Sequence, residues 1–179
     1  MSYKWKKVTA AKLSYDYKKG KLPYTRFEFI VIHYTANDGD LAANNANFYA
    51  KYNKRYAGAH VFVDDHYAYK SVPLQYAAYA VGGAKYPMCE HDGGGKYYGK
   101  CNNYNSISIE MCDTLKDGKH DVSDATLQNT ISIVKYYMNK YNIPADHVIR
   151  HWDVNGKPCP VYFTGKDNKA WDKFKKAIS

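Results

Sequence analysis

Hydrophobic and polar residues follow two different periods along this chain, and each period predicts a kind of element. Residues 29–32, Phe-Ile-Val-Ile, form a short apolar run that is typical of a buried strand. Residues 106–110, Ser-Ile-Ser-Ile-Glu, alternate with period two, so the isoleucines face one side and the polar residues the other. We expect the polar face of this second strand to form the floor of a groove.

Apolar residues three and four positions apart predict an amphipathic helix over residues 123–141. Ser123 or Asp124 is expected to cap its start, because a short polar side chain there accepts a hydrogen bond from a free backbone N–H. Asn142 and Pro144 are expected to end it. The helix would pack its apolar side against a sheet.

Other segments complete an alternation of strands and helices. A helix is predicted over residues 41–52, with Asp38 or Asp40 as its cap, and a closing helix over residues 167–178. Residues 148–150 form a short apolar strand. Interleaved strands and helices predict an α/β fold, in which helices flank a central mixed β-sheet.

The remaining segments are a hairpin and two stretches without strong periodicity. Residues 59–72 predict a β-hairpin, with an Asp-Asp pair at its turn. Residues 1–25 predict an irregular or partly helical lead-in, and the glycine-rich residues 82–103 predict a long surface loop, which is usually functional or mobile. A chain of 179 residues is expected to form a single domain with a substantial core.

The chain is basic, with 26 lysine and arginine residues against 17 acidic ones and a net charge of +9. Such a surface favours anionic partners. The lysines are scattered and no nucleic-acid-binding signature occurs, so no nucleic-acid partner is expected. No run of apolar residues is long enough to span a membrane, and the polar start lacks the apolar segment of a signal peptide. We expect a monomer that is synthesised in the cytoplasm without a signal peptide.

Two histidines and a cysteine are placed as metal ligands would be. His33 follows the apolar run at 29–32, and His151 follows the strand at 148–150, so both can lie at one edge of the same sheet. Cys159 stands between two prolines, which stiffen its backbone. Two imidazoles and a thiolate suit Zn²⁺, and three protein ligands leave a fourth position open, as in catalytic zinc sites.

Each of these observations has a simpler interpretation. A single histidine is more often a surface or core residue than a ligand, and a histidine eight residues before a cysteine is a weak pattern. Cys89, His91 and Cys101 could form another metal site, but no fourth ligand accompanies them. Cys89 and Cys101 could also pair as a disulfide, and their state is left open.

Four motifs, in this order, resemble the zinc-dependent N-acetylmuramoyl-L-alanine amidases of the type-2 amidase and peptidoglycan recognition protein family, in its endolysin-like branch. The resemblance covers residues 25–178, almost the whole chain. The motifs are Ile-Val-Ile-His at 30–33, Ala-His-Val-Phe-Val-Asp-Asp at 59–65, Asn-Ser-Ile-Ser-Ile-Glu at 105–110 and His-x₅-Lys-x-Cys-Pro at 151–160.

The resemblance implies a role for each matching residue. His33, His151 and Cys159 correspond to the ligands of one catalytic Zn²⁺. Glu110 corresponds to the catalytic glutamate of the endolysin-like branch, and Lys157 to a lysine near the developing oxyanion. The reaction implied is hydrolysis of the amide between N-acetylmuramic acid and the L-alanine of the stem peptide.

Substrate contacts are expected from Tyr34, Thr35 and His60, which lie in or beside two of the motifs. The chain also departs from the family pattern. Some members have a catalytic tyrosine directly before the second-motif histidine, where this chain has Ala59, so either Glu110 acts alone as the base or another tyrosine reaches in. Several relatives have Trp-His where residues 79–80 are Tyr-Ala. These departures concern substrate contacts more than the metal.

The family implies a catalytic domain of a phage endolysin or an autolysin, which binds peptidoglycan as a muramyl peptide and acts on the bacterial cell wall. Anionic wall polymers would attract its positive charge. The rival interpretation is a non-catalytic peptidoglycan-binding module on the same fold, but inactive relatives lose the cysteine ligand that this chain has. A structural zinc protein that binds nucleic acid would need a fourth ligand and a basic stripe, and neither is evident.

Overall fold

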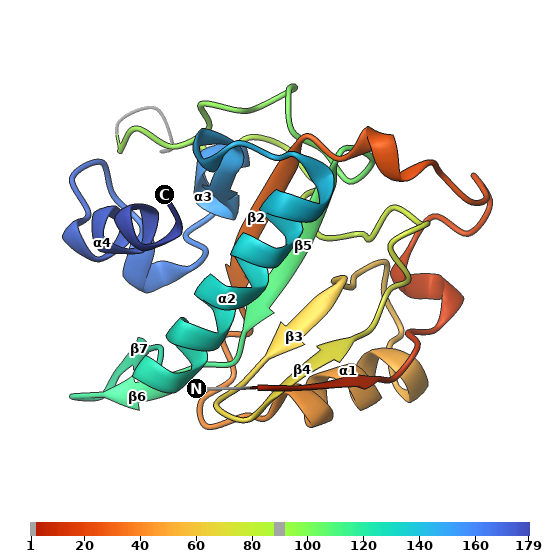
Figure 1. Cartoon of the computed structure of the whole chain (residues 1–179), viewed down its shortest axis with the longest axis horizontal. Helices are drawn as coiled ribbons and strands as arrows, with labels where there is room; N and C mark the ends of the chain where they lie inside the picture. The colour runs from red at the N-terminus through yellow and green to blue at the C-terminus, as the bar shows by residue number, and fades with distance from the viewer. Residues whose placement is uncertain (1–2, 88–91) are drawn as a thin grey trace.

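A computed structural model describes residues 3–87 and 92–179 and has a mixed six-stranded sheet at its centre (Figure 1). The strands are β1 (Lys4–Lys7), β2 (Phe29–Tyr34), β3 (Val61–Val63), β4 (Tyr67–Lys70), β5 (Ser106–Met111), β6 (Thr114–Lys116), β7 (Lys119–Asp121) and β8 (Val148–Arg150). The order in the sheet is β1-β4-β3-β5-β2-β8, and all neighbours are parallel except β3 and β4. Strands β6 and β7 form a separate antiparallel hairpin. The expected α/β fold with a mixed sheet is therefore confirmed.

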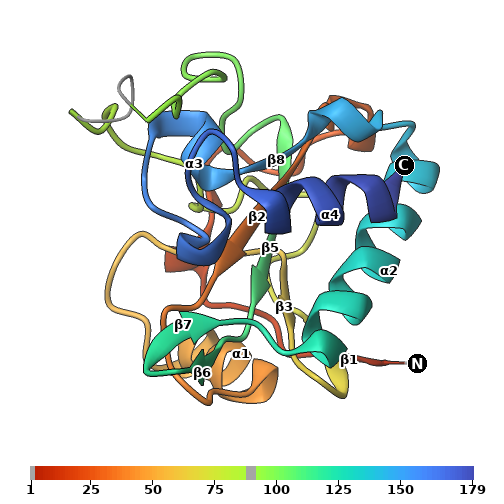
Figure 2. The same ribbon diagram turned by 90° about the vertical axis from the view of Figure 1, so that its left-hand side faces the viewer.

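Helices cover both faces of this sheet (Figure 2). The α-helices in the described residues are α1 (Ala42–Lys51), α2 (Asp124–Tyr141), α3 (His151–Asn155) and α4 (Lys169–Ile178). Short 3₁₀ helices are η1 (Lys12–Ser14), η2 (Tyr24–Arg26), η3 (Ala145–His147) and η4 (Val161–Phe163). Helix α2 packs on β3 and β5 from one side, with α4 beside it, whereas α1 packs on β3 and β4. No helix in the described part of the chain is long and apolar enough to cross a membrane.

Alternation along the central strands sends their side chains into different layers. Ile30 and Ile32 of β2 join the core beneath α2 and α4, whereas Val31 packs on the opposite face. Ile107 and Ile109 of β5 likewise join the α2 core. Each fully buried side chain of this size contributes about 1.5–3 kcal/mol relative to exposure. This packing fixes which face of β2 carries His33.

The polar face of β5 does not form the open floor of a groove. Ser106 and Ser108 are each only 1% exposed, and the Ser106 hydroxyl donates to the carbonyl of Asn102. Glu110, at the end of the strand, is the member of this face that is partly exposed. The prediction was right about alternation but wrong about exposure, because a one-dimensional pattern does not reveal which loops cover a face.

The first helix is capped differently from the prediction. Leu41 occupies the N-cap position and makes no side-chain cap. Instead, the backbone N–H of Ala42 donates to the Asp64 carboxylate at 2.9 Å, from the turn of the β3–β4 hairpin. Asp40, one of the two predicted caps, accepts from the Asn45 side chain. The carboxylate that caps this helix therefore comes from another element, which the local sequence does not show.

The lead-in contains a strand that was not predicted. Residues 4–7, Lys-Trp-Lys-Lys, form β1 at one edge of the sheet, parallel to β4. Lysines are common on edge strands, because their charge discourages pairing with a further strand. Trp5 anchors β1 by an edge contact with the ring of Tyr137, and the Lys70 ammonium lies 4.7 Å from the Trp5 ring centre. A lysine-rich segment is therefore held in the sheet by its pairing with β4 and by the contacts of its single tryptophan.

The long helix and the hairpin are as predicted. Ser123 caps α2 by accepting the Thr126 N–H at 3.0 Å, and Asn142 ends it in a left-handed conformation with φ of 54°. Strands β3 and β4 pair in antiparallel fashion around the turn that contains Asp64 and Asp65. Both elements are defined by residues close together in sequence, so the local pattern was sufficient.

The glycine-rich segment 82–103 forms neither helix nor strand in its described residues, and part of it packs on α3. Tyr86 and Tyr97 donate their backbone N–H groups to the carbonyls of Asn155 and Asp153, both at 2.8 Å. Gly94 approaches so closely that a Cβ there would lie 3.0 Å from both Gly156 and the Trp152 ring. The segment therefore holds α3 in place from outside.

Candidate active site

His33 and Glu110 face each other across two neighbouring strands. Strands β2 and β5 run in parallel, and His33 is the register partner of Glu110. Because side chains alternate along each strand, both point away from the α2 core. The Nδ1 atom of His33 lies 4.0 Å from Glu110 Oε1. The third strand of this group, β8, pairs with β2 from the other side and leads directly to His151.

The position of His151 is fixed by one buried ion pair, which joins Arg150 before it to Asp153 after it. His151 is the first residue of α3, directly after Arg150. Asp153 accepts hydrogen bonds from the Arg150 backbone N–H and Nε at 2.7 and 2.8 Å, and from a terminal guanidinium nitrogen at 2.7 Å. The guanidinium also packs between the rings of Trp152 and Trp171. These contacts fix the turn from β8 into α3, and with it the direction of the imidazole.

Cys159 returns to the same place through a tight loop. Its carbonyl accepts the backbone N–H of Trp152 at 3.0 Å, which ties the loop to α3. Its own N–H donates to the Lys157 carbonyl at 2.7 Å, and the Lys157 N–H donates to the Asn155 side chain at 3.1 Å. The thiol is thus held by backbone hydrogen bonds as well as by the flanking prolines.

These elements bring three ligand atoms together. One atom each of His33, His151 and Cys159 lies within 4.8 Å of the others, and all three residues are buried. The Cys159 sulfur is 3.8 Å from His33 Nδ1, and the two imidazole centres are 4.8 Å apart. The sequence predicted this group, and the structure brings it together from β2, α3 and the loop after α3.

The chemistry of these atoms fits a metal cation. Both ring nitrogens of His151 and the Nε2 of His33 are buried without a hydrogen-bond partner among the described residues. Burial, and then the charge of Lys157, lowers the pKa of His151 to about 3, so the imidazole is neutral and its lone pair is available. Burial raises the pKa of the Cys159 thiol, a cost that a cation offsets when it binds the thiolate. Unpartnered buried nitrogens beside a thiol are otherwise unfavourable.

Glu110 is suited to hold and release a proton near neutral pH. Burial raises the pKa of its carboxyl to about 8, the charges of Asp40 and Asp113 act in the same direction, and Lys157 opposes them. Its Oε2 is buried and has no hydrogen-bond partner in the described chain. A carboxyl with one free oxygen beside a candidate metal centre is typical of a general acid or base.

Lys157 lies where two cavities meet. One cavity, of about 600 Å³, is lined by His151 and Asn155 together with residues of the 82–103 segment. The other, of about 400 Å³, is lined by Glu110 and by residues at the end of β2. Lys157 and Tyr86 line both. The candidate metal centre therefore lies beside a groove with two arms.

Tyr34 and Thr35, two of the predicted substrate contacts, line the cavity that contains Glu110. The Thr35 hydroxyl donates to Asp113 at 2.8 Å. Asp113 also accepts the N–H of Asn37 and binds the His120 ring, each at 2.8 Å. These bonds connect the end of β2 to the β6–β7 hairpin and fix the rim of the cavity.

The third predicted substrate contact, His60, does not lie in the groove. Its side chain is 1% exposed, and both ring nitrogens have backbone partners. Nδ1 accepts the Ser108 N–H at 3.0 Å, and Nε2 lies 3.1 Å from the Tyr76 carbonyl. Burial lowers the pKa of His60 to about 4, so it stays neutral. The structure thus corrects the prediction: His60 ties the start of β3 to β5.

Several groove residues were missed because nothing in their local sequence marks them. Arg55 and Tyr56 come from the loop between α1 and β3, and Tyr86 and Asn103 come from the glycine-rich segment. The chain contains 20 tyrosines, and this abundance was the only hint. The alternative metal site included Cys89 and His91, which lie outside the described residues. Its third member, Cys101, is buried against apolar residues of β2.

Comparison with known proteins gives consistent results. Residues 23–162 match the family described as N-acetylmuramoyl-L-alanine amidase. A probable N-acetylmuramoyl-L-alanine amidase of Bacillus licheniformis is 33% identical over 152 residues, which is 82% of this chain and 40% of that protein. The amidase BlyA of Bacillus subtilis strain 168 is 34% identical over 149 residues, 79% of this chain and 38% of BlyA. The chain thus spans about two fifths of these curated relatives.

Solved structures agree over nearly the whole chain. PlyL superposes with a TM-score of 0.70 at 28% identity, covering 100% of this chain and 98% of PlyL. The catalytic domain of XlyA superposes with a TM-score of 0.71 at 25% identity, covering 98% of this chain and 99% of that domain. Both structures are therefore matched over nearly their whole length.

Proposed function

Because this chain belongs to the N-acetylmuramoyl-L-alanine amidase family, we propose that it is a zinc-dependent peptidoglycan hydrolase of the bacterial cell wall. The bond cleaved is the amide between the lactyl group of N-acetylmuramic acid and the L-alanine of the stem peptide. The observation that carries the proposal is the buried His33, His151 and Cys159 group with Glu110 beside it. The chain would serve as the catalytic domain of a phage endolysin or an autolysin.

One Zn²⁺ ion, held by His33, His151 and Cys159, would supply the Lewis acidity that activates water and polarises a carbonyl at neutral pH. The neutral imidazoles and the buried thiol are the donor types that this ion prefers. The chain's own residues would perform the remaining steps.

Glu110 would move the proton. Its free carboxylate oxygen accepts a proton from the attacking water as the water oxygen bonds to the lactyl carbonyl carbon. The same carboxyl then donates that proton to the alanine nitrogen as the C–N bond breaks, which leaves a carboxylic acid and a free amine. A pKa raised by burial suits both halves of this transfer.

Lys157 would stabilise the negative charge that develops on the carbonyl oxygen. The charge of its ammonium acts on Glu110, His33 and His151, and this shared influence supports the proposed role. A fixed cation aimed at a developing oxyanion contributes more to the transition state than to the ground state.

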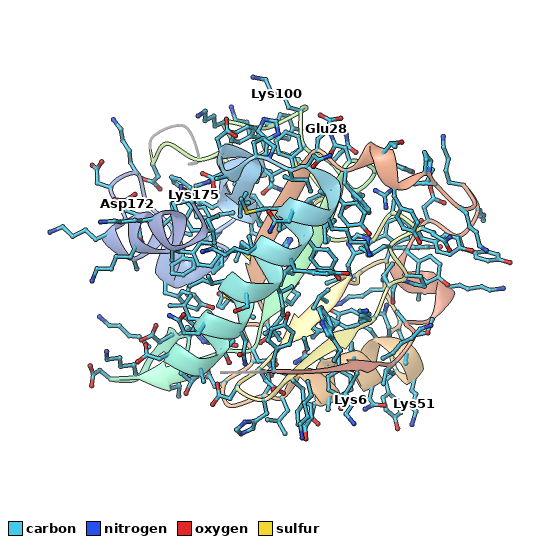
Figure 3. The ribbon with its side chains drawn as sticks, in the orientation of Figure 1. Lys6, Glu28, Lys51, Lys100, Asp172 and Lys175 are labelled. Atoms are coloured by element: carbon cyan, nitrogen blue, oxygen red, sulfur yellow. The ribbon has the colours of Figure 1, made fainter. Side chains whose placement is uncertain are left out.

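Replacing Lys157 with methionine is therefore expected to lower kcat by about 10²–10³-fold, the usual effect of removing one such electrostatic donor. The measurement is steady-state hydrolysis of a soluble muramyl peptide. Lys100→Met, at an exposed surface lysine on the glycine-rich segment, serves as the control and should leave kcat unchanged (Figure 3). A rise in KM without loss of kcat would show that Lys157 only binds substrate.

Mass spectrometry of digested cell wall tests the reaction itself. Free stem peptides that begin with L-alanine, together with glycan strands that carry intact lactyl groups, are the expected products. The rival function, a non-catalytic peptidoglycan-binding module, predicts binding to wall without release of either product. Cuts within the glycan or within the peptide would rule out the proposed amidase.

The positive charge is proposed to attract the protein to anionic wall polymers. Exposed lysines lie at opposite ends of the view in Figure 3, with Lys100 at the top and Lys6 and Lys51 at the bottom. Scattered exposed charges act through long-range attraction, which salt screens. Lysis of whole cells is expected to weaken with added salt more than cleavage of a soluble muramyl peptide does. Equal salt sensitivity of the two activities would show that charge does not target the enzyme.

A further inference from the structure

The two cavities beside the metal centre have different catalytic residues in their walls. The larger cavity, of about 600 Å³, is lined by His151 but not by Glu110. The smaller one, of about 400 Å³, is lined by Glu110 but not by His151. Lys157 and Tyr86 line both, so the cavities adjoin at these two residues. Under the proposed function, the scissile bond would lie at this junction. The two arms of the groove are therefore chemically distinct.

The chemistry of amide hydrolysis assigns the two arms. The group that donates a proton to the departing amine must lie on the amine side of the scissile bond. Glu110 borders only the smaller cavity, so the L-alanine and the residue after it extend into that cavity. The acyl side, which is the muramic acid and its glycan, then extends into the larger one.

Two adjacent residues of one loop also line different cavities. Arg55 and Tyr56 lie in the loop between α1 and β3, yet Arg55 lines the smaller cavity and Tyr56 the larger. A short turn holds this loop: the Arg55 N–H donates to the Asn53 side chain at 3.1 Å, and the Arg55 carbonyl accepts from Ala57 at 2.8 Å. The loop thus presents a cation to one arm and an aromatic ring to the other.

Arg55 has the surroundings of a carboxylate-binding residue. The pKa of the neighbouring Tyr49 hydroxyl is raised by burial and by Glu110, and Arg55 opposes this rise by charge and by hydrogen bonding. Tyr49, which lines the same cavity, therefore lies within reach of both. A guanidinium binds a carboxylate through two parallel hydrogen bonds, which gives both affinity and orientation. A cavity of this size holds only a short piece of peptide, so the carboxylate belongs to the residue next to L-alanine.

The larger arm has the surroundings of a sugar-binding site. Tyr56 is 75% exposed, and its ring packs edge-on against Tyr79, with centres 5.7 Å apart. Asn103 lines the same cavity and is partly exposed. Asn155 also lines it, but this residue is buried and its side chain bonds the Lys157 N–H and the Gly82 carbonyl. Exposed aromatic rings offer flat apolar area to a sugar face, and amides offer hydrogen bonds to its hydroxyl and acetamido groups.

We propose that the substrate lies in one direction along the groove, with its glycan against Tyr56 and Tyr79 and its stem peptide in the Glu110 cavity, where Arg55 binds the carboxylate of the residue after L-alanine. This inference rests on the proposed amidase function, because Glu110 sets the direction. It makes Arg55 a specificity-determining residue for acidic stem peptides.

The test compares two soluble substrates that differ in one group: N-acetylmuramyl-L-alanyl-D-glutamate with its γ-carboxyl blocked as the methylamide, and the same compound with the glutamate α-carboxylate amidated as well. Arg55→Gln is expected to lower kcat/KM for the acid about tenfold, since a charge-assisted bond is lost, and to leave the amide nearly unchanged. Tyr56→Ala, at the adjacent position of the same loop, is the matched control. It should lower kcat/KM for both substrates by the same factor, up to about tenfold.

A further measurement adds a sugar at the acyl end, by comparing γ-blocked N-acetylglucosaminyl-N-acetylmuramyl-L-alanyl-D-glutamate with the monosaccharide compound. The wild type and Arg55→Gln should gain from the second sugar, whereas Tyr56→Ala should lose most of that gain. Equal effects of Arg55→Gln on acid and amide, or loss of the sugar gain in Arg55→Gln instead of Tyr56→Ala, would overturn the assignment. Absence of cleavage of all these substrates and of whole wall by the wild type would instead refute the proposed function.

Discussion

Removal of the metal is expected to abolish amide hydrolysis, and added Zn²⁺ is expected to restore it. Cys159→Ala should have the same effect irreversibly, because the site then has two ligands in place of three. Loss of the Lewis acid removes several kcal/mol of transition-state stabilisation, so turnover should fall at least about 10³-fold. Activity assays after dialysis against a chelator, with metal content measured by elemental analysis, test this expectation.

A second readout separates loss of metal from loss of fold. A ligand that binds only the folded state stabilises it by about 4 kcal/mol when it is present at 1,000 times its Kd. Added Zn²⁺ should therefore raise the melting temperature of the metal-free wild type, but not that of Cys159→Ala. Cys101→Ala is the matched control: this buried cysteine lies in an apolar cluster, so the variant should keep metal and activity while losing about 1 kcal/mol of stability. Full activity in protein shown to be free of metal would end the zinc mechanism.

Replacing Glu110 with glutamine is expected to lower turnover by about 10²–10⁴-fold, the range for removal of a general acid–base group, with zinc content unchanged. Glutamine keeps the shape of the side chain but neither accepts nor delivers the proton. Glu28→Gln is the matched control, because Glu28 is an exposed glutamate just before β2 and should be neutral. Rates like those of the wild type in Glu110→Gln would remove this residue from the mechanism.

Although Glu110→Gln should lower turnover, it should raise the stability of the metal-free protein at neutral pH. Burial raises the pKa of Glu110 from an ordinary 4.5 to about 8, so in the metal-free protein the folded state binds this proton more tightly than the unfolded chain does. Its contribution to stability is therefore largest below pH 4.5 and is lost as the pH rises toward 8. Metal-free Glu110→Gln should gain stability relative to metal-free wild type between pH 5 and pH 8, as measured by thermal melts at the two values. A constant difference across this range would contradict the raised pKa.

Elements with strong local patterns were predictable. The amphipathic period and the Ser123 cap defined α2, and alternation in Ser-Ile-Ser-Ile-Glu defined β5. Strand β1 was missed because three of its four residues are lysine, whereas its contacts with β4 and with Tyr137 come from distant parts of the chain. The cap of α1 was assigned to the wrong aspartate because Asp64 reaches it from a hairpin 22 residues away.

The candidate metal ligands could be predicted because two of them directly follow the ends of strands. His33 and His151 both follow apolar strand segments, and parallel strands place such ends at one edge of a sheet, so the sequence was sufficient to predict the His33, His151 and Cys159 group. The role of His60 was predicted wrongly because the partners of its side chain are distant in the sequence. It lies in a recognisable motif, but its two nitrogens bind the backbone of Ser108 and Tyr76, which only the folded chain brings beside it.

By itself, the sequence determined the family, the α/β architecture and the residues able to hold a metal, because these depend on residue types and on periods that repeat over a few positions. Tertiary structure alone decided the shape of the groove and which side chains face it. Arg55, Tyr56 and Tyr86 reach the site from loops with no local signature. The raised pKa of Glu110 likewise depends on burial by distant segments. Cavity walls and desolvation arise from contacts between residues far apart in the chain, and a linear pattern does not specify those contacts.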